Sequence, residues 1–400
     1  MKSQVPYYLS KNQRIALLNK MRDEKESRLH TTEETSSPSF QSSSVPGPSS
    51  FLPPTSVAAL TTVAGTGVAG YSGDGGLAVA ATLFAASGVD VDPTRGLYYI
   101  ADTVNNCIRM VIKSTGIIST EAGTGVYGQG GDGGLATAAQ LAGPYGVAVD
   151  VSQGNFYIAD TWNACIRLVT KSTGIINTVA GTCSNGGYSG DNGLATAALV
   201  LFPMCVAVGA QSSMVYISDT FNFRVRKITT STGIIETIWS ANSTGFTSFP
   251  VGIAVDPLSG NPFFVNTALC SVIMISGFSY NYVYTVVAGT GMCSAYNPNN
   301  GDGQLATRAS FAGPMGIAFD SSTGNFYVAD DSNSTIRMIT RSTGIITTVA
   351  GTGARGNTSV TLNNPFDVAI DISTGVLLIA DTANNQIRSQ RLQNVPSQGT

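Results

Sequence analysis

Carboxylate side chains recur at two kinds of place in the sequence, and carboxylates can bind cations or take part in acid–base chemistry. The first kind closes the motif Tyr-Ile-Ala-Asp-Thr and its variants, at Asp102, Asp160, Asp219, Asp330 and Asp381. The second lies in Gly-Asp-Gly-Gly and its variants, at Asp74, Asp132, Asp191 and Asp302. If the first set surrounded one opening, it could bind a cation or a basic peptide.

A structural interpretation of the first set competes with that one, because an arginine follows each aspartate after seven residues. The pairs are Asp102 with Arg109, Asp160 with Arg167, Asp219 with Arg226, Asp330 with Arg337, and Asp381 with Arg388. A feature repeated in nearly every copy of a unit usually serves the geometry of that unit. We therefore interpret them as structural turn pairs.

The second set offers one carboxylate per loop, whereas a calcium loop needs several oxygen ligands at alternating positions and a closing glutamate. An aspartate before glycine is also a natural turn or helix cap, and the alanine-containing segment that follows suggests one helical turn. We predict no metal site and no cofactor. Aromatic residues near these loops suit a protein or glycan contact surface, or the packing of one loop on the next: Trp162, Tyr71, Tyr127, Tyr188 and Tyr296.

Catalytic residues are scarce. The only histidine, His30, precedes all the repeated motifs, so a Ser-His-Asp or Cys-His constellation and a histidine-ligated zinc are excluded from the repeated region. The repeated region contains two glutamates, Glu121 and Glu236, and both fall in predicted outer strands. The sequence names no catalytic residue and predicts a protein that is not an enzyme.

Six cysteines leave two alternatives open. Cys165 follows a predicted turn and Cys183 follows the last strand of the same unit, on the same side, and Cys270 and Cys293 repeat this arrangement. Two disulfides in an oxidising compartment, with Cys107 and Cys205 free, are one hypothesis. Six reduced, mostly buried thiols are the other.

The elements that carry these residues are short strands. Residues 143–182 contain four apolar runs, GVAVD, NFYIAD, CIRLVT and GIINTVAG, separated by turns rich in Gly, Asn and Ser. This pattern predicts a four-stranded antiparallel meander. One such sheet cannot bury both of its faces, and the sequence repeats the unit six times.

The sixth copy lacks its fourth strand, and residues 60–67, LTTVAGTG, match that strand but have no first three strands before them. We therefore predict an all-β fold, a six-bladed β-propeller of four-stranded antiparallel blades, closed by the N-terminal strand, which completes the last blade.

The repeated Gly-(Val/Ile)-Ala-(Val/Phe)-Asp, Tyr-Ile-Ala-Asp-Thr-x-Asn and TGIIxTVAGTG motifs resemble the NHL-repeat family over residues 60–393, in particular the teneurin type with long GDGG connectors. The resemblance implies a propeller that binds proteins, RNA or, in some members, carries out catalysis. The fourth copy, VNTALCSVIMI, departs from the pattern, so we expect its blade to be the least regular.

Three parts are predicted. Residues 1–58 are expected to form a Ser/Pro-rich disordered tail whose charged start could form a short helix, residues 59–393 the propeller, and residues 394–400 a disordered C-terminus. The net charge of −3 disfavours nucleic acid as a partner. No signal peptide is visible, and the longest apolar run is too short for a membrane helix. The compartment is not determined, and the cysteine placement allows an extracellular setting.

In each blade the second-to-third turn and the connector to the next blade leave on the same side. We call this side, with its Asp-Thr-x-Asn turns and Gly-Asp-Gly-Gly connectors, the loop face, and the other side the plain face. Binding residues are expected on the loop face because function concentrates in loops. The sequence predicts a monomeric, non-catalytic scaffold that binds a protein there. Alternatives are glycan or extracellular-ligand recognition and, with less support, a lactonase-like or lyase-like enzyme or an RNA binder.

Overall fold

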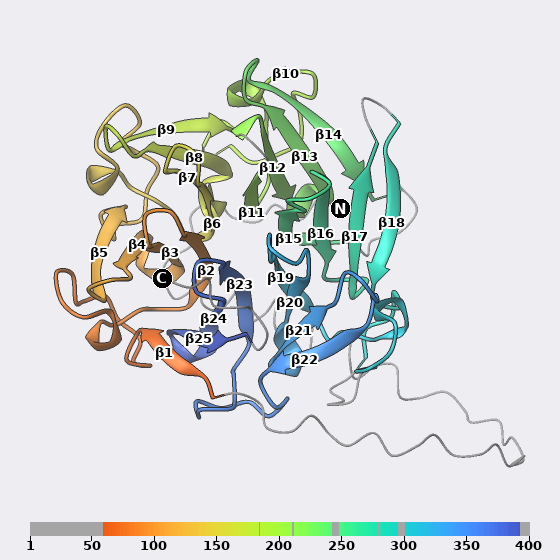
Figure 1. Cartoon of the computed structure of the whole chain (residues 1–400). Coiled ribbons are helices and arrows are strands. Elements are labelled where there is room, and N and C mark those ends of the chain that lie inside the picture. The colour runs from red at the N-terminus through yellow and green to blue at the C-terminus, as the bar shows by residue number, and fades with distance from the viewer. Residues whose placement is uncertain are drawn as a thin grey trace, which may run out of the picture.

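The computed structural model describes residues 59–183, 185–209, 212–241, 248–277, 281–294 and 301–392. Six antiparallel sheets surround a central axis like the blades of a propeller (Figure 1). The predicted fold class is therefore confirmed. The predicted tails, residues 1–58 and 394–400, lie outside the described residues.

Each blade is a meander whose first strand lies nearest the axis and whose last lies at the rim (Figure 1). Blade 1 contains β2 (Ala86–Asp92), β3 (Leu97–Asp102), β4 (Cys107–Ile112) and β5 (Ile117–Ala122). Blade 2 contains β6 (Pro144–Asp150), β7 (Asn155–Asp160), β8 (Cys165–Thr170) and β9 (Ile175–Ala180). Blade 3 contains β11 (Pro203–Val208), β12 (Met214–Asp219), β13 (Arg224–Thr229) and β14 (Ile234–Ser240), with the short β10 (Gly193–Leu194) outside β14.

The remaining blades follow the same order. Blade 4 contains β15 (Pro250–Val255), β16 (Pro262–Asn266), β17 (Ser271–Ser276) and β18 (Val283–Ala288). Blade 5 contains β19 (Pro314–Phe319), β20 (Phe326–Asp330), β21 (Thr335–Ile339) and β22 (Ile346–Ala350). Blade 6 contains β23 (Pro365–Asp371), β24 (Val376–Asp381) and β25 (Gln386–Arg391), and its outer strand is β1 (Thr61–Ala64).

The ring is closed by β1, which pairs antiparallel with β25 from the other end of the chain. Leu60 and Ala64, at the two ends of this pairing, are buried at 5% and 0% exposure. The predicted closure by the N-terminal strand is confirmed, and it ties the first blade to the last.

Apolar side chains fill the spaces between adjacent blades. One cluster, for example, joins Val89 and Ile100 of blade 1 to Leu378 and Ala380 of blade 6. Alternate residues of each strand face one neighbouring blade or the other, so both faces of every sheet are covered. This explains why the strands read as nearly continuous apolar runs.

Threonine side chains link the blades at the loop face. In five blades the threonine after the motif aspartate, or after Asn266 in blade 4, donates to the carbonyl oxygen of the first residue of the next inner strand. The bonds are Thr103 to Pro144, Thr161 to Pro203, Thr220 to Pro250, Thr267 to Pro314 and Thr382 to Ala86, at 2.6–2.8 Å. In blade 5, Asp331 replaces the threonine and accepts a bond from Asn364 at 3.0 Å.

The connectors differ from the sequence prediction in one respect. Their alanine-containing segments form single 3₁₀ turns: Ala78–Ala80, Ala136–Ala138, Ala195–Ala197 and Ala306–Arg308. The N-cap of each is a leucine, such as Leu77, and not the preceding aspartate. Of the two roles expected for the aspartates, a turn or a helix cap, the structure shows the turn: Asp74 lies in a turn closed by the bond from Gly76 N–H to the carbonyl of Gly73 at 3.0 Å. The carboxylates make longer-range contacts, described next.

Candidate binding surface on the loop face

The motif aspartates are fully buried, and each joins its own turn to the connector that precedes the blade. Asp160, for example, accepts the backbone N–H of Ala142 at 2.7 Å through Oδ1 and the side-chain amide of Asn163 at 2.7 Å through Oδ2. Equivalent backbone bonds of 2.7 Å reach the other four aspartates of the set. Each turn is a 3₁₀ turn that ends on a residue with positive φ, such as Ala164 at 54°. These carboxylates hold the turn in shape and do not open onto solvent.

The arginines placed seven residues later join the two aspartate sets. In blade 2, Arg167 lies 3.4 Å from Asp160 and 2.6 Å from the connector residue Asp132. Blades 1, 3 and 5 repeat the arrangement, with Arg109, Arg226 and Arg337 at 2.6 Å from Asp74, Asp191 and Asp302. In blade 6, Arg388 contacts Asp381 at 3.6 Å and Asn357 at 3.0 Å. The closer partner of each of the four connector-bound arginines is thus the connector aspartate.

Burial governs the charge state of the motif aspartates. Loss of solvent raises the pKa of Asp102, Asp160 and Asp381 to about 6 and that of Asp219 to about 7, although hydrogen bonds and the neighbouring arginines oppose the rise. Each arginine therefore stabilises a carboxylate that water cannot reach. This arrangement suits blade architecture and not the capture of a cation.

The connector aspartates lie closer to solvent, with side-chain exposures from 23% to 47%. One carboxylate oxygen of each is engaged by an arginine, so the four do not form a free ligand set. Among the residues that the structure describes, no group of three or more His, Cys, Asp or Glu side chains could hold a metal ion.

The predicted tyrosines do not form one cluster. Tyr71 bonds Thr120 at 2.9 Å and lies beside Arg109, whereas Tyr188 donates to Asp191 at 2.7 Å and stacks on Arg224 at 3.7 Å. Tyr127, partly buried, forms an isolated bridge with Leu141. Each tyrosine therefore lies with its own connector. Tyr296 lies outside the described residues.

Trp162, in contrast, begins a row of aromatic rings across blades 2, 3 and 4. It packs edge-on against Phe202 at 4.7 Å between ring centroids, Phe202 against Phe221 at 4.8 Å, and Phe221 and Phe223 against Phe249 at 5.8 and 5.3 Å. We call these five residues the aromatic row. All five side chains are partly exposed, and all come from turns or connectors of the loop face.

The aromatic row includes two strained residues. Phe202 and Phe223 adopt left-handed backbone conformations, with φ of 52° and 56°. In blades 1, 5 and 6 the same turn positions hold small or polar residues, including Asn364 for the first and Asn106 and Asn385 for the second. Bulky residues adopt this conformation rarely, at a cost on the order of 1 kcal/mol or more each.

Sequence reasoning found Trp162 but missed the four phenylalanines. Their signal was present, because blades 1, 5 and 6 have smaller residues at the corresponding positions. Phe221, for instance, fills the variable third position of Asp-Thr-x-Asn, as Trp162 does, where blades 5 and 6 have Ser332 and Ala383. What the sequence could not show is that these positions in adjacent blades touch one another.

The aromatic row continues inward to an apolar plug. Tyr145, Met204 and Val251 form a buried cluster against which Met315, Phe366, Trp162 and Phe249 pack. Five of these residues are each the second residue of an inner strand, so they lie where the axis meets the loop face: Tyr145, Met204, Val251, Met315 and Phe366. We call those five residues the central plug. Plug and row together make the centre of the loop face apolar.

Behind the plug, a cavity of about 230 Å³ is lined by the inner strands of all six blades. Its polar side chains include Asp90 and Asp367, whose carboxylates accept the backbone N–H groups of Val149 at 2.7 Å and Val89 at 3.2 Å. Burial raises the pKa of Asp90 to about 6 and that of Asp367 to about 8. Cys205 also lines the cavity, and burial raises its thiol pKa to about 12.

A titration test follows from Asp367. Because its pKa is raised from 3.8 to about 8, the unfolded chain ionises first, and stability falls as the pH rises between about 4 and 8. Asp367→Asn should remove this fall. Relative to the wild type, the variant should gain about 4 kcal/mol in free energy of unfolding between pH 5 and pH 8.5, because each pH unit in most of this window costs the wild type about 1.4 kcal/mol. Urea unfolding at both pH values checks this, and parallel pH profiles for the two proteins would contradict it.

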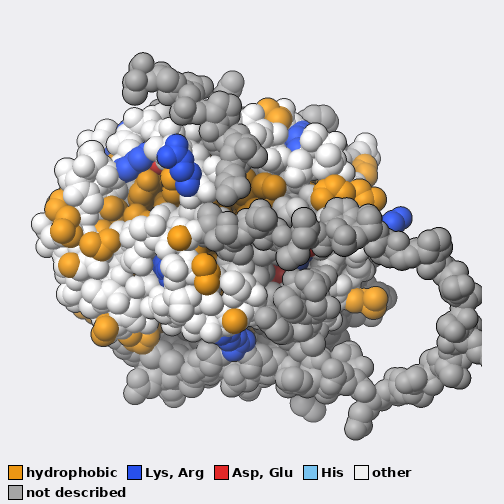
Figure 2. All heavy atoms as spheres, turned by 60° about the horizontal axis from the view of Figure 1, so that its bottom comes forward, with side chains coloured by type: hydrophobic (Ala, Val, Ile, Leu, Met, Phe, Trp, Pro, Cys, Tyr) orange, Lys and Arg blue, Asp and Glu red, His pale blue; other side chains and the backbone are white. Residues whose placement is uncertain are grey.

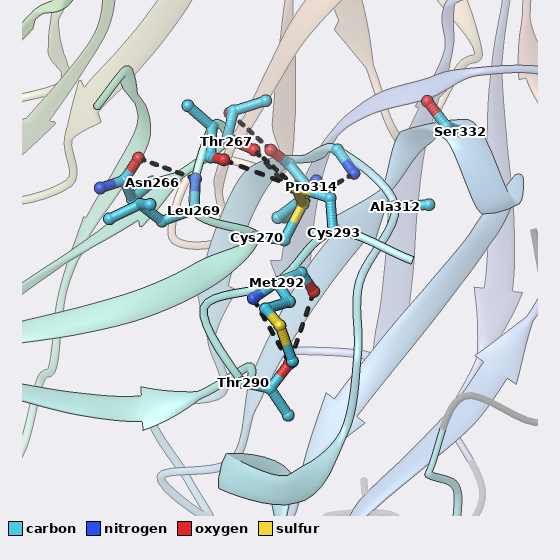
Figure 3. The surroundings of a disulfide bond; sticks show 12 residues. Asn266, Thr267, Leu269, Cys270, Thr290, Met292, Cys293, Ala312, Pro314 and Ser332 are labelled. Carbon is cyan, nitrogen blue, oxygen red and sulfur yellow. Dashed lines mark hydrogen bonds between the residues drawn. A yellow bond between two sulfur atoms is a disulfide. The ribbon is translucent and has the colours of Figure 1, made fainter. Parts of the chain in front are cut away.

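Two disulfides cross the loop face. Cys165 is joined to Cys183 with Cα atoms 5.0 Å apart, and Cys270 to Cys293 with Cα atoms 5.1 Å apart, while Cys107 and Cys205 are free. These are the two pairs that the sequence suggested. Figure 3 shows the second pair, with Thr267 and Pro314 beside it. Each bond ties a connector to the preceding turn, so it fixes a segment of the loop face.

The surface is sparsely charged. On the side drawn in Figure 2, the Lys and Arg side chains of the described residues are few, and hydrophobic side chains reach the surface at several separate places. In the described part of the chain, no helix is long and apolar enough to cross a membrane.

Six meander sheets around a plugged axis define a six-bladed β-propeller. The family described as the teneurin NHL domain matches residues 182–378, and the NHL repeat matches residues 141–167. The chain therefore carries NHL repeats and is related to the teneurin type.

Similar curated proteins carry the same repeats. Human NHL repeat-containing protein 2 is 23% identical over 74% of this chain and 38% of its own length. Zebrafish (Danio rerio) Teneurin-3 is 28% identical over 60% of this chain and 9% of its own length. The chain therefore spans well under half of the relatives that it matches.

Solved structures share the fold at low identity. A structural genomics protein of unknown function from Bacteroides thetaiotaomicron matches with a TM-score of 0.62 and 18% identity, over 83% of this chain and 75% of that one. A gluconolactonase of Xanthomonas campestris matches with a TM-score of 0.54 and 13% identity, over 84% of this chain and 90% of that one. These matches show the fold alone, which both enzymes and proteins without known activity use.

Proposed function

We propose that this propeller is a non-catalytic scaffold that binds a protein partner through the centre of the loop face. The contact would consist of the aromatic row and the two partly exposed residues of the central plug, Met315 and Phe366. The observation that supports this proposal most is that five aromatic side chains from three blades lie together, partly exposed, at positions that blades 1, 5 and 6 fill with smaller residues. Aromatic side chains dominate the binding energy of protein interfaces.

The strain in the row supports the proposal. Phe202 and Phe223 hold left-handed backbone conformations that asparagine or glycine would adopt at lower cost. Strain of this kind persists where the side chain has a role that a more stable residue could not fill. Burial alone does not supply such a role, since both side chains remain partly exposed.

A protein partner fits better than the alternatives. Glycan sites combine an aromatic platform with several free polar groups, whereas the polar groups around the row are used within the turns, as the bonds of Asn222 to Asp219 and Gly187 illustrate. An enzyme would need a nucleophile, base or metal site, and the described residues offer no metal cluster. The carboxyls of Asp90 and Asp367 line the cavity behind the central plug, away from the aromatic row.

The test is a quantitative pull-down with the full chain as bait. Trp162→Ala combined with Phe221→Ala should reduce capture of each specific partner at least about tenfold, because the two rings would be central hot-spot residues. Tyr71→Ala is the matched control, since Tyr71 is an exposed aromatic residue of the loop face that belongs to blade 1 and lies outside the row. Unchanged capture by the double variant, with native thermal stability, would refute the proposal.

A further inference from the structure

The outer edges of the blades are covered by backbone from the preceding connector. In blade 5, the N–H of Gly303 donates to the carbonyl of Ile346 at 2.8 Å, and the N–H of Ile346 donates to the carbonyl of Gln304 at 3.0 Å. The next outward amide, that of Thr348, donates to the carboxylate of Asp302 at 2.8 Å. A short extended segment, Asp-Gly-Gln-Leu-Ala, thus acts as an antiparallel fifth strand on this edge.

Three other blades repeat this covering segment. Its leucine pairs antiparallel with the outer strand in the bridges Leu77 with Ile117, Leu135 with Ile175, and Leu194 with Ile234. The outer edge of blade 6 is also engaged, because Leu60 on the N-terminal side of β1 donates its N–H to the carbonyl of Ser359 at 2.6 Å. Edge covering of this kind prevents unwanted strand pairing.

Blade 4 is the exception. Its outer strand β18 pairs with β17, and no other described segment pairs with its outward side. In blade 4 Tyr284 pairs with Ile275, as Ile118 pairs with Val111 in blade 1, so Tyr284 and Ile118 occupy equivalent positions. In blade 1 the backbone N–H and C=O of Ile118 both bond to the connector outside the sheet. The backbone N–H and C=O of Tyr284 therefore point outward, as does the N–H of Val286, which is equivalent to Thr348.

This edge is exposed, uncharged and held in place. Val283, Tyr284 and Val286 are 59%, 49% and 48% exposed. The side chain of Tyr284 donates to the carbonyl of Ile238 on β14 at 3.0 Å, so the strand is fixed against blade 3. The strand, VYTVVA, contains no lysine or proline of the kind that protects free edges. An apolar edge whose outward backbone groups pair with none of the described residues is a template for strand addition.

We propose that the outer edge of blade 4 binds an extended segment of a partner protein by antiparallel strand addition. The chemistry of that segment can be read from the four covered edges: an acidic residue, then two small or uncharged residues, then leucine and alanine. The leading carboxylate would accept the N–H of Val286, as Asp302 accepts that of Thr348. This site lies on the rim of the propeller and is independent of the proposed loop-face contact.

A fluorescent peptide tests the proposal directly on the full chain. The peptide Gly-Asp-Gly-Gly-Leu-Ala-Thr-Ala-Ala repeats the sequence of residues 131–139, and its binding is followed by fluorescence anisotropy. Saturable binding is expected. Val286→Pro removes the outward N–H without altering a bond to β17 and should weaken binding at least about tenfold. Val286→Thr is the matched control, because blades 1, 2 and 5 have threonine at this position, and it should bind as the wild type does.

A second arm removes any dependence on how well the proline variant folds. N-methylation of the third peptide residue deletes the donor that, in the chain's own connector, is Gly133 bonded to Ile176 at 2.9 Å. Wild-type protein should then lose binding to the same degree. Absence of peptide binding, or binding that survives both changes, would overturn the proposal. Self-association of the chain that Val286→Pro abolishes, without peptide binding, would overturn it in favour of a second copy at this edge.

Discussion

Arg167→Met is expected to lower the free energy of unfolding by about 3–5 kcal/mol, the range found when one partner of a buried ion pair is removed. The arginine is fully buried and lies between Asp160, itself fully buried, and Asp132. Methionine replaces its apolar stem but leaves the carboxylate of Asp160 without a cation and without solvent. Asp132 is 47% exposed and can be hydrated instead, so most of the loss arises at Asp160.

The pH dependence of this loss identifies its cause. Asp160 has a folded pKa of about 6, and removing the arginine raises that pKa further, so the destabilisation grows as the pH rises through about 6. Near pH 5 the carboxyl is protonated in both proteins, and the difference should shrink. Urea unfolding at about pH 5 and pH 8 measures it.

Lys171→Met is the matched control for Arg167→Met. Lys171 also belongs to blade 2, but its ion pair with Glu121, at 2.7 Å, is partly exposed, so its loss should stay below about 1 kcal/mol. Equal losses in the two variants, or a loss in Arg167→Met that does not depend on pH, would contradict the structural role assigned to the buried pairs.

Removal of the closing strand should have an effect at least as large. A chain that begins at residue 68 lacks β1, and with it the pairing to β25 and the buried side chains of Leu60 and Ala64. Blade 6 then exposes the edge of β25 and part of the core that it shares with blade 5. We expect a loss of about 4 kcal/mol or more in the free energy of unfolding, or failure to fold as a monomer.

A chain that begins at residue 59 provides the comparison, because it keeps β1 and removes only residues that the sequence assigns to a tail. It should unfold at the same urea concentration as the full chain, by tryptophan fluorescence and circular dichroism. If the chain that begins at residue 68 matched it, the ring would not depend on closure by β1.

The fold could be predicted because its signals are local and repeated. Short apolar runs, turn residues and six copies of one unit indicate a propeller, and the strand missing after residue 393 is the one found at residues 60–67. The seven-residue spacing of aspartate and arginine also follows from a hairpin, as in Asp160 and Arg167. These contacts lie within one blade, where sequence distance and spatial distance agree.

Contacts between segments far apart in sequence could not be predicted in the same way. The bond from Arg167 to Asp132 spans 35 residues, and only the ring geometry brings the connector onto the arginine. The aromatic row depends on adjacent blades, as in the contact between Trp162 and Phe202. The edge of β18, with which no described segment pairs on the outer side, can be recognised only by comparison with the edges that connectors cover.

The structure separates the residues that build the propeller from those that distinguish it. The repeated aspartates and arginines first suggest a charged site, but they bond to one another and to the backbone of turns and connectors. The candidate surfaces arise where a blade departs from the repeat: Phe202 and Phe223 in blade 3, and Val286 on the outer edge of blade 4, which no described connector segment covers. We expect partner specificity to reside in such departures.

Site-specific photo-crosslinking tests the central claim, that the aromatic row contacts a protein partner. With p-benzoylphenylalanine in place of Trp162 in the full chain, irradiation in the presence of the protein captured by the pull-down should yield one discrete adduct. The same group in place of Tyr71, outside the row, should yield little or none. Adducts of equal intensity from both positions, or an adduct from position 71 alone, would contradict the proposed binding surface.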